Sequence, residues 1–415
     1  MKVAILTLGC KLNQADSARA AGRMRPHCEE ARRPEEADLI LLNTCTVTHK
    51  ADREARQALR CLRRRNPHAL LAVMGCSVRR DQTPYRAMPE VDEVLATDED
   101  LAAFLDRVAG SEGGRGHACV PHFGDRTRAF LKVQEGCNFP CTYCIIPSVR
   151  GPSRSVPVEV VVEDFRALLD VGYREVVLTG VNTGEYGKDN GFRGGLEGLL
   201  ERLLAVPGRY RIRLNSVEPR AVTPGIRSLM RREAALAKHL QVPLQSGSDT
   251  VLRAMRRNYR AAFYEEQLRA LAEEVPGVGI GADVLVGFPT ESPTDFEATL
   301  ALLERSPVAF VHAFTYSPRP GTAAAAMPSI PQREAAERTR RVRALGEHKR
   351  LAFAARFVGR PLSALTLAPA ADRGRALTEN FLHVALPRPE EPNRFVTVAL
   401  RSVGSEGLAA QLVEA

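Results

Sequence analysis

An alternation of short apolar runs with helical patterns is the feature that most limits how this chain of 415 residues can fold. Near the start, the apolar runs 3–8, 39–43 and 70–74 are separated by helical patterns such as 52–65. This alternation is typical of parallel strands joined by crossover helices. We therefore expect residues 1–110 to form an open parallel α/β domain.

A longer series of the same kind begins near residue 123. Helical patterns follow most of its six apolar runs, which are 129–134, 175–180, 210–216, 239–245, 278–289 and 308–316. A closed barrel of this type has eight units, so six units predict a partial (β/α)6 barrel over 123–356 that is open on one side. The glycine-rich stretch 111–122 is expected to be a linker.

The end of the chain has a different pattern. A charge-laced helical stretch, 332–359, precedes short β runs with turn residues between them, which are 362–368, 381–387, 394–400 and 409–414. Short strands at this spacing predict a small OB-like β-barrel over 357–415. The expected fold class is therefore α/β, with an N-terminal parallel sheet, a central partial barrel and a C-terminal β-barrel.

The composition narrows the class of protein. Hydrophobic residues make up 44% and charged residues 26%, which is typical of globular chains. No apolar run is long enough to cross a membrane and no signal peptide is recognisable, so we expect a cytoplasmic protein without membrane contact. Nine cysteines favour a reducing compartment in which thiolates act as ligands. The net charge of +9 permits a polyanionic partner but does not establish one.

The stretch EGCNFPCTYCIIPSVRG places Cys137, Cys141 and Cys144 within eight residues. A structural zinc site needs four protein ligands, and neither a second CxxC nor a histidine at a familiar spacing is present. Three thiolates on a cubane 4Fe–4S cluster leave one iron free to bind a small chelating ligand. The cluster is the favoured interpretation, and zinc is the alternative.

A second set of cysteines is spread over the N-terminal part. Cys10, Cys45 and Cys76 each follow one of its apolar runs. Because the carboxyl ends of parallel strands meet at one edge of a sheet, these thiols can converge there. The alternative is three unrelated buried thiols. The remaining cysteines fit neither set and are expected to be structural, namely Cys28, Cys61 and Cys119.

The CxxxCxxC spacing directly after the expected first barrel strand resembles the radical S-adenosylmethionine (SAM) superfamily. This resemblance implies that Cys137, Cys141 and Cys144 bind a 4Fe–4S cluster whose open iron chelates SAM. It also implies a low-potential electron donor. The segments that resemble SAM-binding segments of the superfamily contain Gly180, Val181, Asn182, Ser216, Glu218, Gln245, Ser246, Asp283 and Gly287.

The segments TLGCKLNQAD, NTCTVT and VMGC resemble the N-terminal domain of the methylthiotransferases. This resemblance extends over essentially the whole chain and implies a TRAM domain from residue 357. It further implies that Cys10, Cys45 and Cys76 bind a second 4Fe–4S cluster, which carries the sulfur to be transferred. The implied activity is the radical methylthiolation of a substrate at the expense of SAM.

Three substrate classes are known in that family. GCKLNQAD, NTCTVTHKAD and GVNTGEYG are similar to the branch that modifies C2 of threonylcarbamoyladenosine at position 37 of the tRNA anticodon loop. The isopentenyladenosine branch is closer to GCQMN and NTCAVR, and the ribosomal-protein branch has GCPKN. Those two branches are the alternatives within the family. An iron–sulfur RNA-binding protein without chemistry is the alternative outside it, although it has no use for the SAM segments.

RNA binding, rather than DNA binding, is expected from the C-terminal barrel and the charged helix before it. The expected phosphate and stacking contacts are Arg338, Arg340, Arg341, Arg343, Phe381 and Phe395. From Arg356 onward the chain has seven arginines and six acids, a net charge of only +1. Shape and stacking are therefore expected to contribute more than charge to RNA binding by the barrel.

Overall fold

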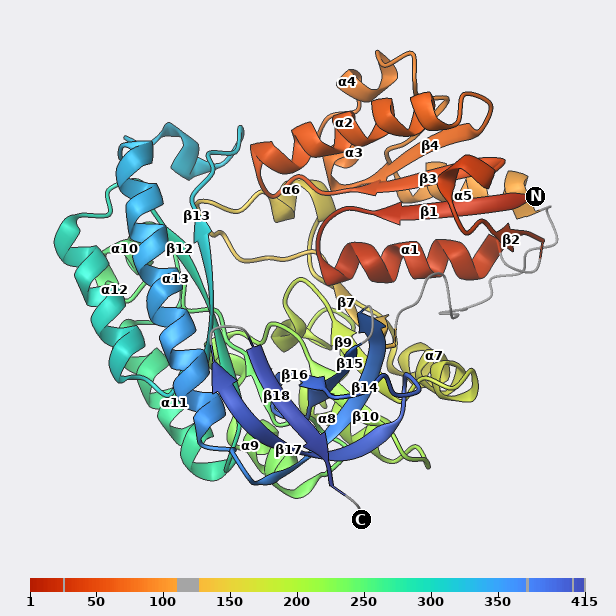
Figure 1. Ribbon diagram of the computed structural model, residues 1–415. Helices are drawn as coiled ribbons and strands as arrows, with labels where there is room; N and C mark the ends of the chain where they lie inside the picture. Colours follow the sequence, from red (N-terminus) through yellow and green to blue (C-terminus); the bar gives the residue numbers. More distant parts are fainter. Residues whose placement is uncertain (25–26, 110–126, 371–372, 405–406, 414–415) are drawn as a thin grey trace.

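The computed structural model describes residues 1–415 except 25–26, 110–126, 371–372, 405–406 and 414–415 (Figure 1). The predicted linker 111–122 and Cys119 lie outside the described residues. The described chain forms an N-terminal α/β part, a central set of barrel strands with outer helices, and a C-terminal β-barrel. The predicted α/β fold class is confirmed.

The N-terminal part is a parallel sheet in the order β2-β1-β3-β4-β5. Its strands are β1 (Lys2–Thr7), β2 (Glu29–Glu30), β3 (Leu39–Thr44), β4 (Leu70–Gly75) and β5 (Glu93–Leu95). Its helices are α1 (Lys11–Met24), η1 (Pro34–Glu36), α2 (His49–Arg65), α3 (Cys76–Arg80), α4 (Thr83–Arg86) and α5 (Asp98–Ala109).

Apolar side chains cover both faces of this sheet. Ile40 and Leu42 of β3 pack with Leu59 of α2, whereas Leu39 and Leu41 pack on the opposite face in a cluster with residues of α1 and α5. A strand that is buried on both faces has a continuous apolar sequence, as 39–43 does. The predicted parallel sheet of the N-terminal part is therefore confirmed.

The central part contains two parallel sheets, β10-β9-β6 and β11-β12-β13, joined by a bridge between Ile212 and Leu236. The strands are β6 (Ala129–Lys132), β9 (Glu175–Thr179), β10 (Arg211–Leu214), β11 (His239–Gln241), β12 (Gly279–Val286) and β13 (Phe310–Thr315). Within the described chain, no pairing closes β13 onto β6. All the predicted strands are present, and the barrel is open between its first and last strand.

Helices and one small hairpin complete the central part. The helices are α6 (Ile146–Arg150), α7 (Val158–Asp170), η2 (Thr183–Glu185), α8 (Gly195–Leu204), η3 (Pro219–Ala221), α9 (Pro224–Arg232), α10 (Asp249–Ala254), α11 (Ala261–Glu274), α12 (Pro293–Arg305), η4 (Ala323–Ala326) and α13 (Gln332–Ala355). The antiparallel pair β7 (Gln134–Glu135) and β8 (Arg154–Ser155) encloses the cysteine-rich loop. This pair was not predicted, because two-residue strands have no periodicity.

The C-terminal part is a closed barrel in the order β14-β15-β16-β18-β17. Its strands are β14 (Pro361–Ala370), β15 (Arg373–Thr378), β16 (His383–Leu386), β17 (Phe395–Gly404) and β18 (Gly407–Leu412). The strand β15 was missed because its sequence, RGRALT, contains two arginines and a glycine and only a short apolar end. The barrel itself agrees with the prediction.

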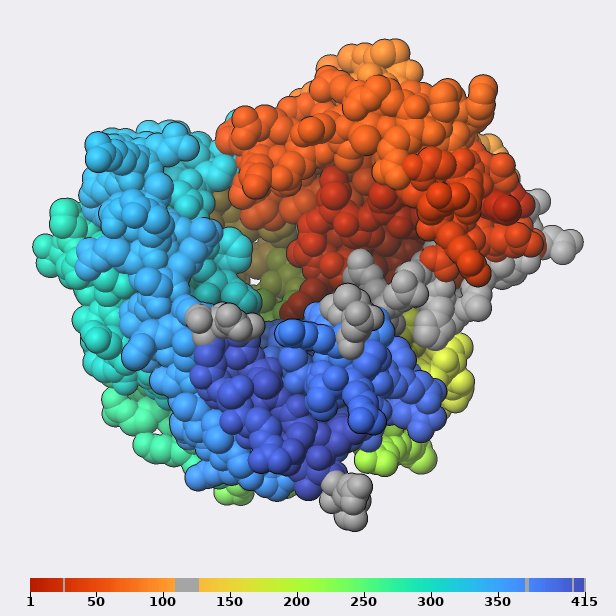
Figure 2. All heavy atoms as spheres, in the orientation of Figure 1, coloured from red at the N-terminus to blue at the C-terminus, as the bar shows by residue number. Residues whose placement is uncertain are grey.

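The three parts surround a hollow. Figure 2 shows it near the centre of the molecule, between the N-terminal part, the region of β13 and α13, and the C-terminal barrel. In Figure 1 this region lies between α1 and β13. Among the described helices, none is both long and apolar enough to cross a membrane.

Candidate active site

The N-terminal cysteines meet at the carboxyl edge of the first sheet. Cys10 lies between β1 and α1, Cys45 follows β3, and Cys76 begins α3 after β4. The Oδ1 atom of Asn13 lies 3.2 Å from Cys10 Sγ and 4.0 Å from Cys76 Sγ. A Cβ atom at Gly9 would lie 3.2 Å from Cys45 Sγ. The predicted convergence of these three thiols is therefore seen in the structure.

Glycines precede two of these cysteines for a steric reason. Gly9 and Gly75 have φ values of +112° and +104°, which residues other than glycine rarely adopt. A Cβ atom would also lie 2.7 Å from Cys45 Cβ at the first position and 2.3 Å from Asn43 Oδ1 at the second. Both Gly-Cys pairs thus turn the chain sharply where a strand ends.

Asn13 lies in the first cysteine site, although the sequence did not indicate it. Its amide nitrogen donates to Asn43 Oδ1 at 2.9 Å and to the Thr44 carbonyl oxygen at 2.8 Å. These bonds orient its Oδ1 atom toward the cysteines. The signal in the sequence was its position three residues after Cys10, which places Asn13 in the first turn of α1, just after that cysteine.

The second cysteine set lies in the loop closed by β7 and β8. Cys137 Sγ accepts a hydrogen bond from the backbone N–H of Phe139 at 3.4 Å, and Cys141 Sγ accepts one from Arg257 Nη1 at 3.3 Å. Arg257 also forms an ion pair with Glu218. Arg257 was not predicted, since 116 residues separate it from Cys141.

Burial raises the pKa of several of these thiols. It raises the pKa of Cys76 to about 11 and that of Cys144 to about 12, and it also raises the pKa values of Cys45 and Cys137. A thiolate in these positions needs a nearby cation to replace its lost hydration. Metal ligation provides one and releases the thiol protons.

The donors of both sites are thiolates, which are the ligands of iron–sulfur cubanes, in which each thiolate binds a different iron. Among the described residues, no three Cys, His, Asp or Glu side chains are placed to hold one metal ion.

A cavity of about 400 Å³ beside the second cysteine loop is lined by two of the predicted SAM contacts. Phe139, Asn182 and Glu218 line it. Asn182 is 3% exposed, and among the described residues neither atom of its side-chain amide has a hydrogen-bond partner. Because a buried amide is costly without partners, this cavity fits a polar ligand.

The other predicted SAM contacts have varied surroundings. Gly180 leaves no room for a Cβ atom, which would lie 2.9 Å from Gln134 Oε1, and Val181 is half-buried beside it. Ser216 accepts a hydrogen bond from Thr183 Oγ1 through its carbonyl oxygen at 3.0 Å. Asp283 Oδ1 accepts a hydrogen bond from Gln241 Nε2 at 2.9 Å.

Three predicted contacts have structural roles in their turns. Gln245 adopts a φ of +63° and bridges to Val284. The hydroxyl of Ser246 is fully buried and accepts a hydrogen bond from the N–H of Ser248 at 3.2 Å. Gly287, with a φ of +77°, donates its N–H to Glu291 Oε2 at 2.9 Å and packs against Ala335.

Arg150 connects the two cysteine sites. It ends α6, just after the second cysteine loop, and its Nε atom donates to Cys76 Sγ at 3.2 Å. Its Nη2 atom donates to Asn13 Oδ1 at 3.1 Å. The guanidinium of Arg150 thus hydrogen-bonds to a thiol of the first site. In the sequence, Arg150 comes just after the cysteines of the second site.

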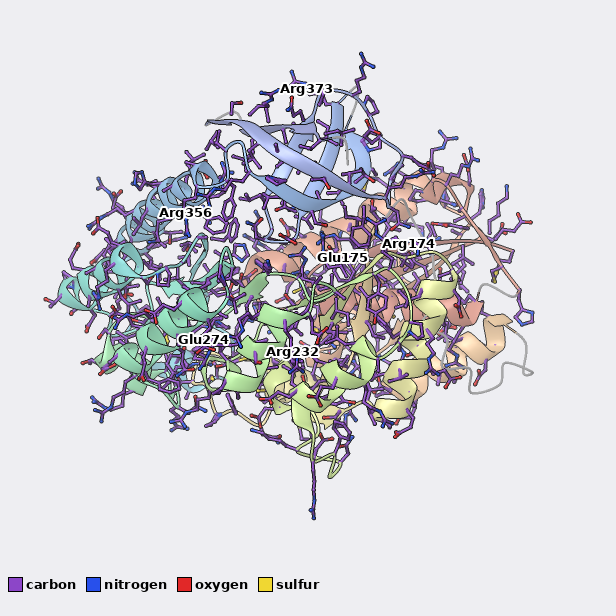
Figure 3. The ribbon with its side chains drawn as sticks, turned by 90° about the horizontal axis from the view of Figure 1, so that it is seen from below. Arg174, Glu175, Arg232, Glu274, Arg356 and Arg373 are labelled. Carbon is purple, nitrogen blue, oxygen red and sulfur yellow. The ribbon has the colours of Figure 1, made fainter. Side chains whose placement is uncertain are left out.

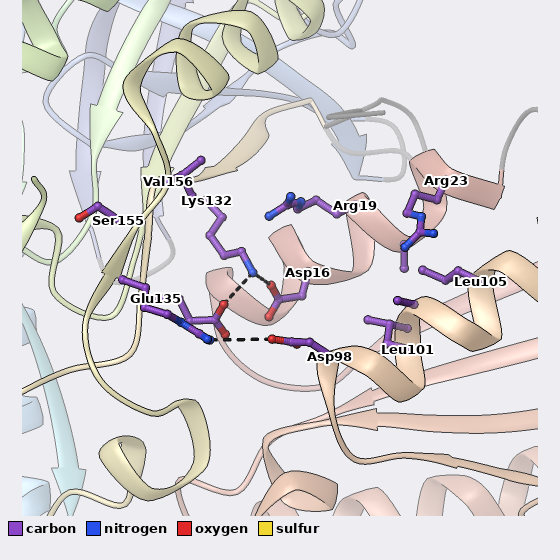
Figure 4. Close-up of a pocket in the computed structure, with 13 residues that line it drawn as sticks. Asp16, Arg19, Arg23, Asp98, Leu101, Leu105, Lys132, Glu135, Ser155 and Val156 are labelled. Carbon is purple, nitrogen blue, oxygen red and sulfur yellow. Dashed lines mark hydrogen bonds and ion pairs between the residues drawn. The ribbon is translucent and has the colours of Figure 1, made fainter. Parts of the chain in front are cut away.

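A charged junction supports this connection. Arg150 Nη1 forms ion pairs with Asp16 at 3.1 Å and Glu135 at 2.9 Å, and Lys132 Nζ pairs with the same two carboxylates. Figure 4 shows Asp16, Lys132 and Glu135 at a cavity of about 360 Å³ between α1, α5 and the strands β6 to β8. Lysine and arginine hold the pKa of Asp16 down, at about 2, despite its burial.

Two of the predicted RNA contacts have other partners within the protein. Arg338 is 4% exposed and pairs with Glu291 at 2.6 Å, so its guanidinium is closed off from solvent. The ring of Phe381 stacks on His239 at a centroid distance of 4.1 Å and lies against Arg213. Phe381 is half-buried and packs between the two barrels.

The remaining predicted RNA contacts are accessible to different extents. Arg340 and Arg341 are exposed and pair with Glu337 and Glu297 respectively. Arg343 is exposed too, whereas Phe395 is half-buried beneath the guanidinium of Arg211. Of the unassigned thiols, Cys28 belongs to the N-terminal core and Cys61 lies half-buried on α2.

Comparison with known proteins identifies the class of protein. Residues 131–303 match the radical SAM superfamily, and residues 2–96 match a family described as uncharacterized protein family UPF0004. A radical SAM methyltransferase, TsrM from Kitasatospora setae, is similar in fold, with a TM-score of 0.54 at 13% identity over 78% of this chain and 77% of that one. The fold and the cysteine-rich loop thus define a radical SAM protein.

Similarity to curated proteins identifies the family. A threonylcarbamoyladenosine tRNA methylthiotransferase from Aquifex aeolicus is 36% identical over 96% of this chain and 100% of its own length. Its counterpart from Bacillus subtilis is 34% identical over 99% of this chain and 97% of its own length. The protein belongs to the radical SAM tRNA methylthiotransferase family, whose members are enzymes that carry two 4Fe–4S clusters and SAM.

Proposed function

We propose that this enzyme methylthiolates C2 of N6-threonylcarbamoyladenosine at position 37 of tRNA, in the anticodon loop. The observation that carries the proposal is the link between two three-cysteine sites through Arg150 at one side of the central barrel. The substrate branch is supported by the names of the Aquifex and Bacillus relatives and by the segment GCKLNQAD around Cys10.

In this proposal each cysteine set would hold one cluster. Cys137, Cys141 and Cys144 would hold the cluster that binds SAM, and the convergent N-terminal set would hold the other, on Cys10, Cys45 and Cys76. When bound, the clusters and SAM supply the low-potential electron, the radical and the atoms of the methylthio group. A radical route is required because the C2–H of adenine is neither acidic enough for a side-chain base nor nucleophilic enough for polar methyl transfer.

The protein's own residues bind, orient and enclose the reactants. The buried amide of Asn182 and the carboxyl of Glu218 face the cavity beside the second cysteine loop, where they are placed to orient SAM. Asn13 and Arg150 orient the thiols of the first site. The hollow between the three parts is the proposed entrance for the anticodon loop.

The isopentenyladenosine branch is the second candidate function. A tRNA-2-methylthio-N(6)-dimethylallyladenosine synthase from Moorella thermoacetica is 36% identical over 88% of this chain and 87% of its own length. Percentage identity therefore does not separate the two branches. A low-potential electron donor and a location in the cytoplasm, where tRNA is available, are part of either proposal.

Nucleoside mass spectrometry of tRNA tests the proposal. We would express the protein in cells that lack their own methylthiotransferases and compare their tRNA with that of cells without it. We expect 2-methylthio-threonylcarbamoyladenosine to appear. The methylthio-isopentenyl nucleoside would assign the other branch, and the absence of both with full iron content would contradict a tRNA substrate.

A further inference from the structure

Lys11 bridges the first cysteine site and the central barrel. It follows Cys10 at the start of α1, and its Nζ atom donates to Asn215 Oδ1, directly after β10, at 2.8 Å. In Figure 1 this end of α1 points toward the central strands. The ammonium group therefore lies where the N-terminal part meets the interior of the barrel.

The ammonium of Lys11 has no carboxylate partner among the residues that the structure describes. The two acidic groups that act on it are Glu175 and Asp283. Glu175 is bound by Arg213 at 2.9 Å, and Asp283 Oδ1 accepts from Gln241 at 2.9 Å. Both carboxylates are therefore engaged with other side chains.

Positive charge predominates around Lys11. Arg128 and Arg213 are the cations that act on it most strongly, and both also face Glu175, Arg128 at 3.6 Å. Arg211 also pairs with Glu175, at 3.5 Å, so four cations share the surroundings of the two engaged carboxylates. Because a partly buried lysine is normally paired, this corner is suited to an anionic ligand with a carboxylate.

We propose that Lys11 binds the carboxylate of the threonylcarbamoyl group and thereby selects this nucleoside over the isopentenyl one. This inference rests on the proposed function. A threonylcarbamoyl group ends in a free carboxylate and a hydroxyl, whereas an isopentenyl group is entirely apolar. An apolar group against Lys11 would leave its ammonium desolvated and unpaired, which discriminates strongly against that substrate.

The methionine part of SAM is another source of a carboxylate near this region. Lys11 and Asn215 do not line the cavity that holds Asn182 and Glu218, two of the predicted SAM contacts. Lys11 is instead the neighbour of Cys10 in the first site, the site proposed to carry the sulfur that reaches the nucleoside. Its position therefore favours the nucleoside as the source.

Binding of short RNA hairpins to the cluster-loaded protein tests the proposal without turnover. The hairpins would carry threonylcarbamoyladenosine, its carboxamide analogue, or isopentenyladenosine at the target position, and fluorescence anisotropy would measure each Kd. We expect the unaltered protein to bind the carboxylate hairpin about tenfold more tightly than the carboxamide hairpin, because only the carboxylate accepts a hydrogen bond between two charged groups from Lys11. Lys11→Gln should remove that preference, and Lys11→Arg should retain much of it.

The control is Lys50→Gln, which removes a lysine whose side chain is 76% exposed on α2 and should leave all three Kd values unchanged. SAM binding to Lys11→Gln should also be unchanged. A carboxylate preference that survives in Lys11→Gln would overturn the inference. So would equal weakening of all three hairpins, which indicates a phosphate contact, or a loss of SAM binding, which indicates the methionyl carboxylate.

The same measurement separates this inference from the proposed function. If the unaltered protein prefers the isopentenyl hairpin, the substrate branch is contradicted and the inference falls with it. If it prefers the threonylcarbamoyl hairpin over the isopentenyl one but binds the carboxamide equally well, the branch stands and only the role of Lys11 is overturned.

Discussion

At the scale of single residues, each cysteine site has a guanidinium against one of its sulfurs. Arg257 donates to Cys141 and Arg150 donates to Cys76, from different parts of the chain. Hydrogen bonds to the sulfurs of an iron–sulfur cluster help to set its reduction potential. Because the added electron makes the cluster more negative, a donor and a positive charge favour the reduced form.

Arg257→Lys should lower the reduction potential of the cluster on the second cysteine loop. Lysine keeps the charge but loses the planar fork that reaches Cys141 and Glu218 together. A lost hydrogen bond of about 1.5 kcal/mol corresponds to roughly 60 mV for one electron. Redox titration followed by electron paramagnetic resonance measures the shift.

Arg150→Lys is the matched variant for that experiment, because it should shift the cluster of the first site instead. The prediction is contradicted if either substitution shifts both clusters equally, since each guanidinium touches the sulfur of only one set.

The sequence allowed the cysteines to be found but not the residues that orient them. Cys10, Cys45 and Cys76 could be predicted to converge because each follows an apolar run. Arg150 and Arg257 could not be assigned, because their sulfur partners lie 74 and 116 residues away. Contacts of that kind depend on how separate elements pack, which no local pattern contains.

At the scale of elements, the segment after β13 supports the first cysteine site. Arg319, which is 1% exposed, donates to Thr46 Oγ1 at 2.8 Å and pairs with Asp52 at 2.6 Å. Thr46 follows Cys45 directly, and Asp52 lies on α2. A loop of the central part thus anchors the chain around a cysteine of the N-terminal part.

Arg319→Ala should destabilise the N-terminal part by about 3–5 kcal/mol, because it leaves the buried Asp52 without its closest cation. Urea unfolding of the protein measures the loss. Combining it with Asp52→Asn should restore part of the stability, since the uncompensated charge is then removed. Strictly additive effects of the two substitutions would contradict a direct coupling.

The exposed arginines of α13 are expected to contribute to tRNA affinity through phosphate contacts. Arg340→Ala with Arg341→Ala should weaken tRNA binding and reduce the salt slope by about 1–2. Filter binding at several salt concentrations measures both quantities. Replacing Arg231 and Arg232 of α9 is the control, because Arg232 lies far from Arg373 of the C-terminal barrel in Figure 3. An unchanged slope in the α13 variant would make that helix an ordinary solvated face.

The elements themselves were predicted where their patterns are long. The strands of the parallel sheets have apolar runs, and α13 was expected over 332–359 and ends at Ala355. The strand β15 and the hairpin of β7 and β8 were missed, because they are short or carry arginine and glycine. Because the C-terminal barrel closes through β15, the order of the strands in this barrel was not predictable.

At the scale of the whole molecule, buried polar groups join the two barrels. Glu175 is fully buried and is bound by Arg213, whose Nη2 atom also donates to the Thr378 carbonyl oxygen at 3.1 Å. Figure 3 shows Glu175 close to the C-terminal barrel. His239 lies in the same interface, stacked on Phe381. Packing between the barrels therefore requires that Glu175 and Arg213 stay charged and that His239 stays neutral.

The stability of this interface should fall in mild acid because of His239. Burial and the positive charges of Arg213, Lys11, His312 and Arg128 hold its pKa well below the usual 6.5. Above pH 6.5, His239 is neutral in both the folded and the unfolded chain. Below it, only the unfolded chain takes up the proton, so the folded state loses about 1.4 kcal/mol per pH unit until the lowered pKa is reached.

Thermal unfolding at pH 7.5 and pH 5.5 tests this linkage. His239→Leu keeps an apolar contact with Phe381 and removes the titrating ring, so its Tm should fall less between the two pH values than that of the unaltered protein. His348→Leu, an exposed position on α13, should retain the full decrease. An equal decrease in all three proteins would mean that other groups control the acid sensitivity, and that the interface tolerates a charged His239.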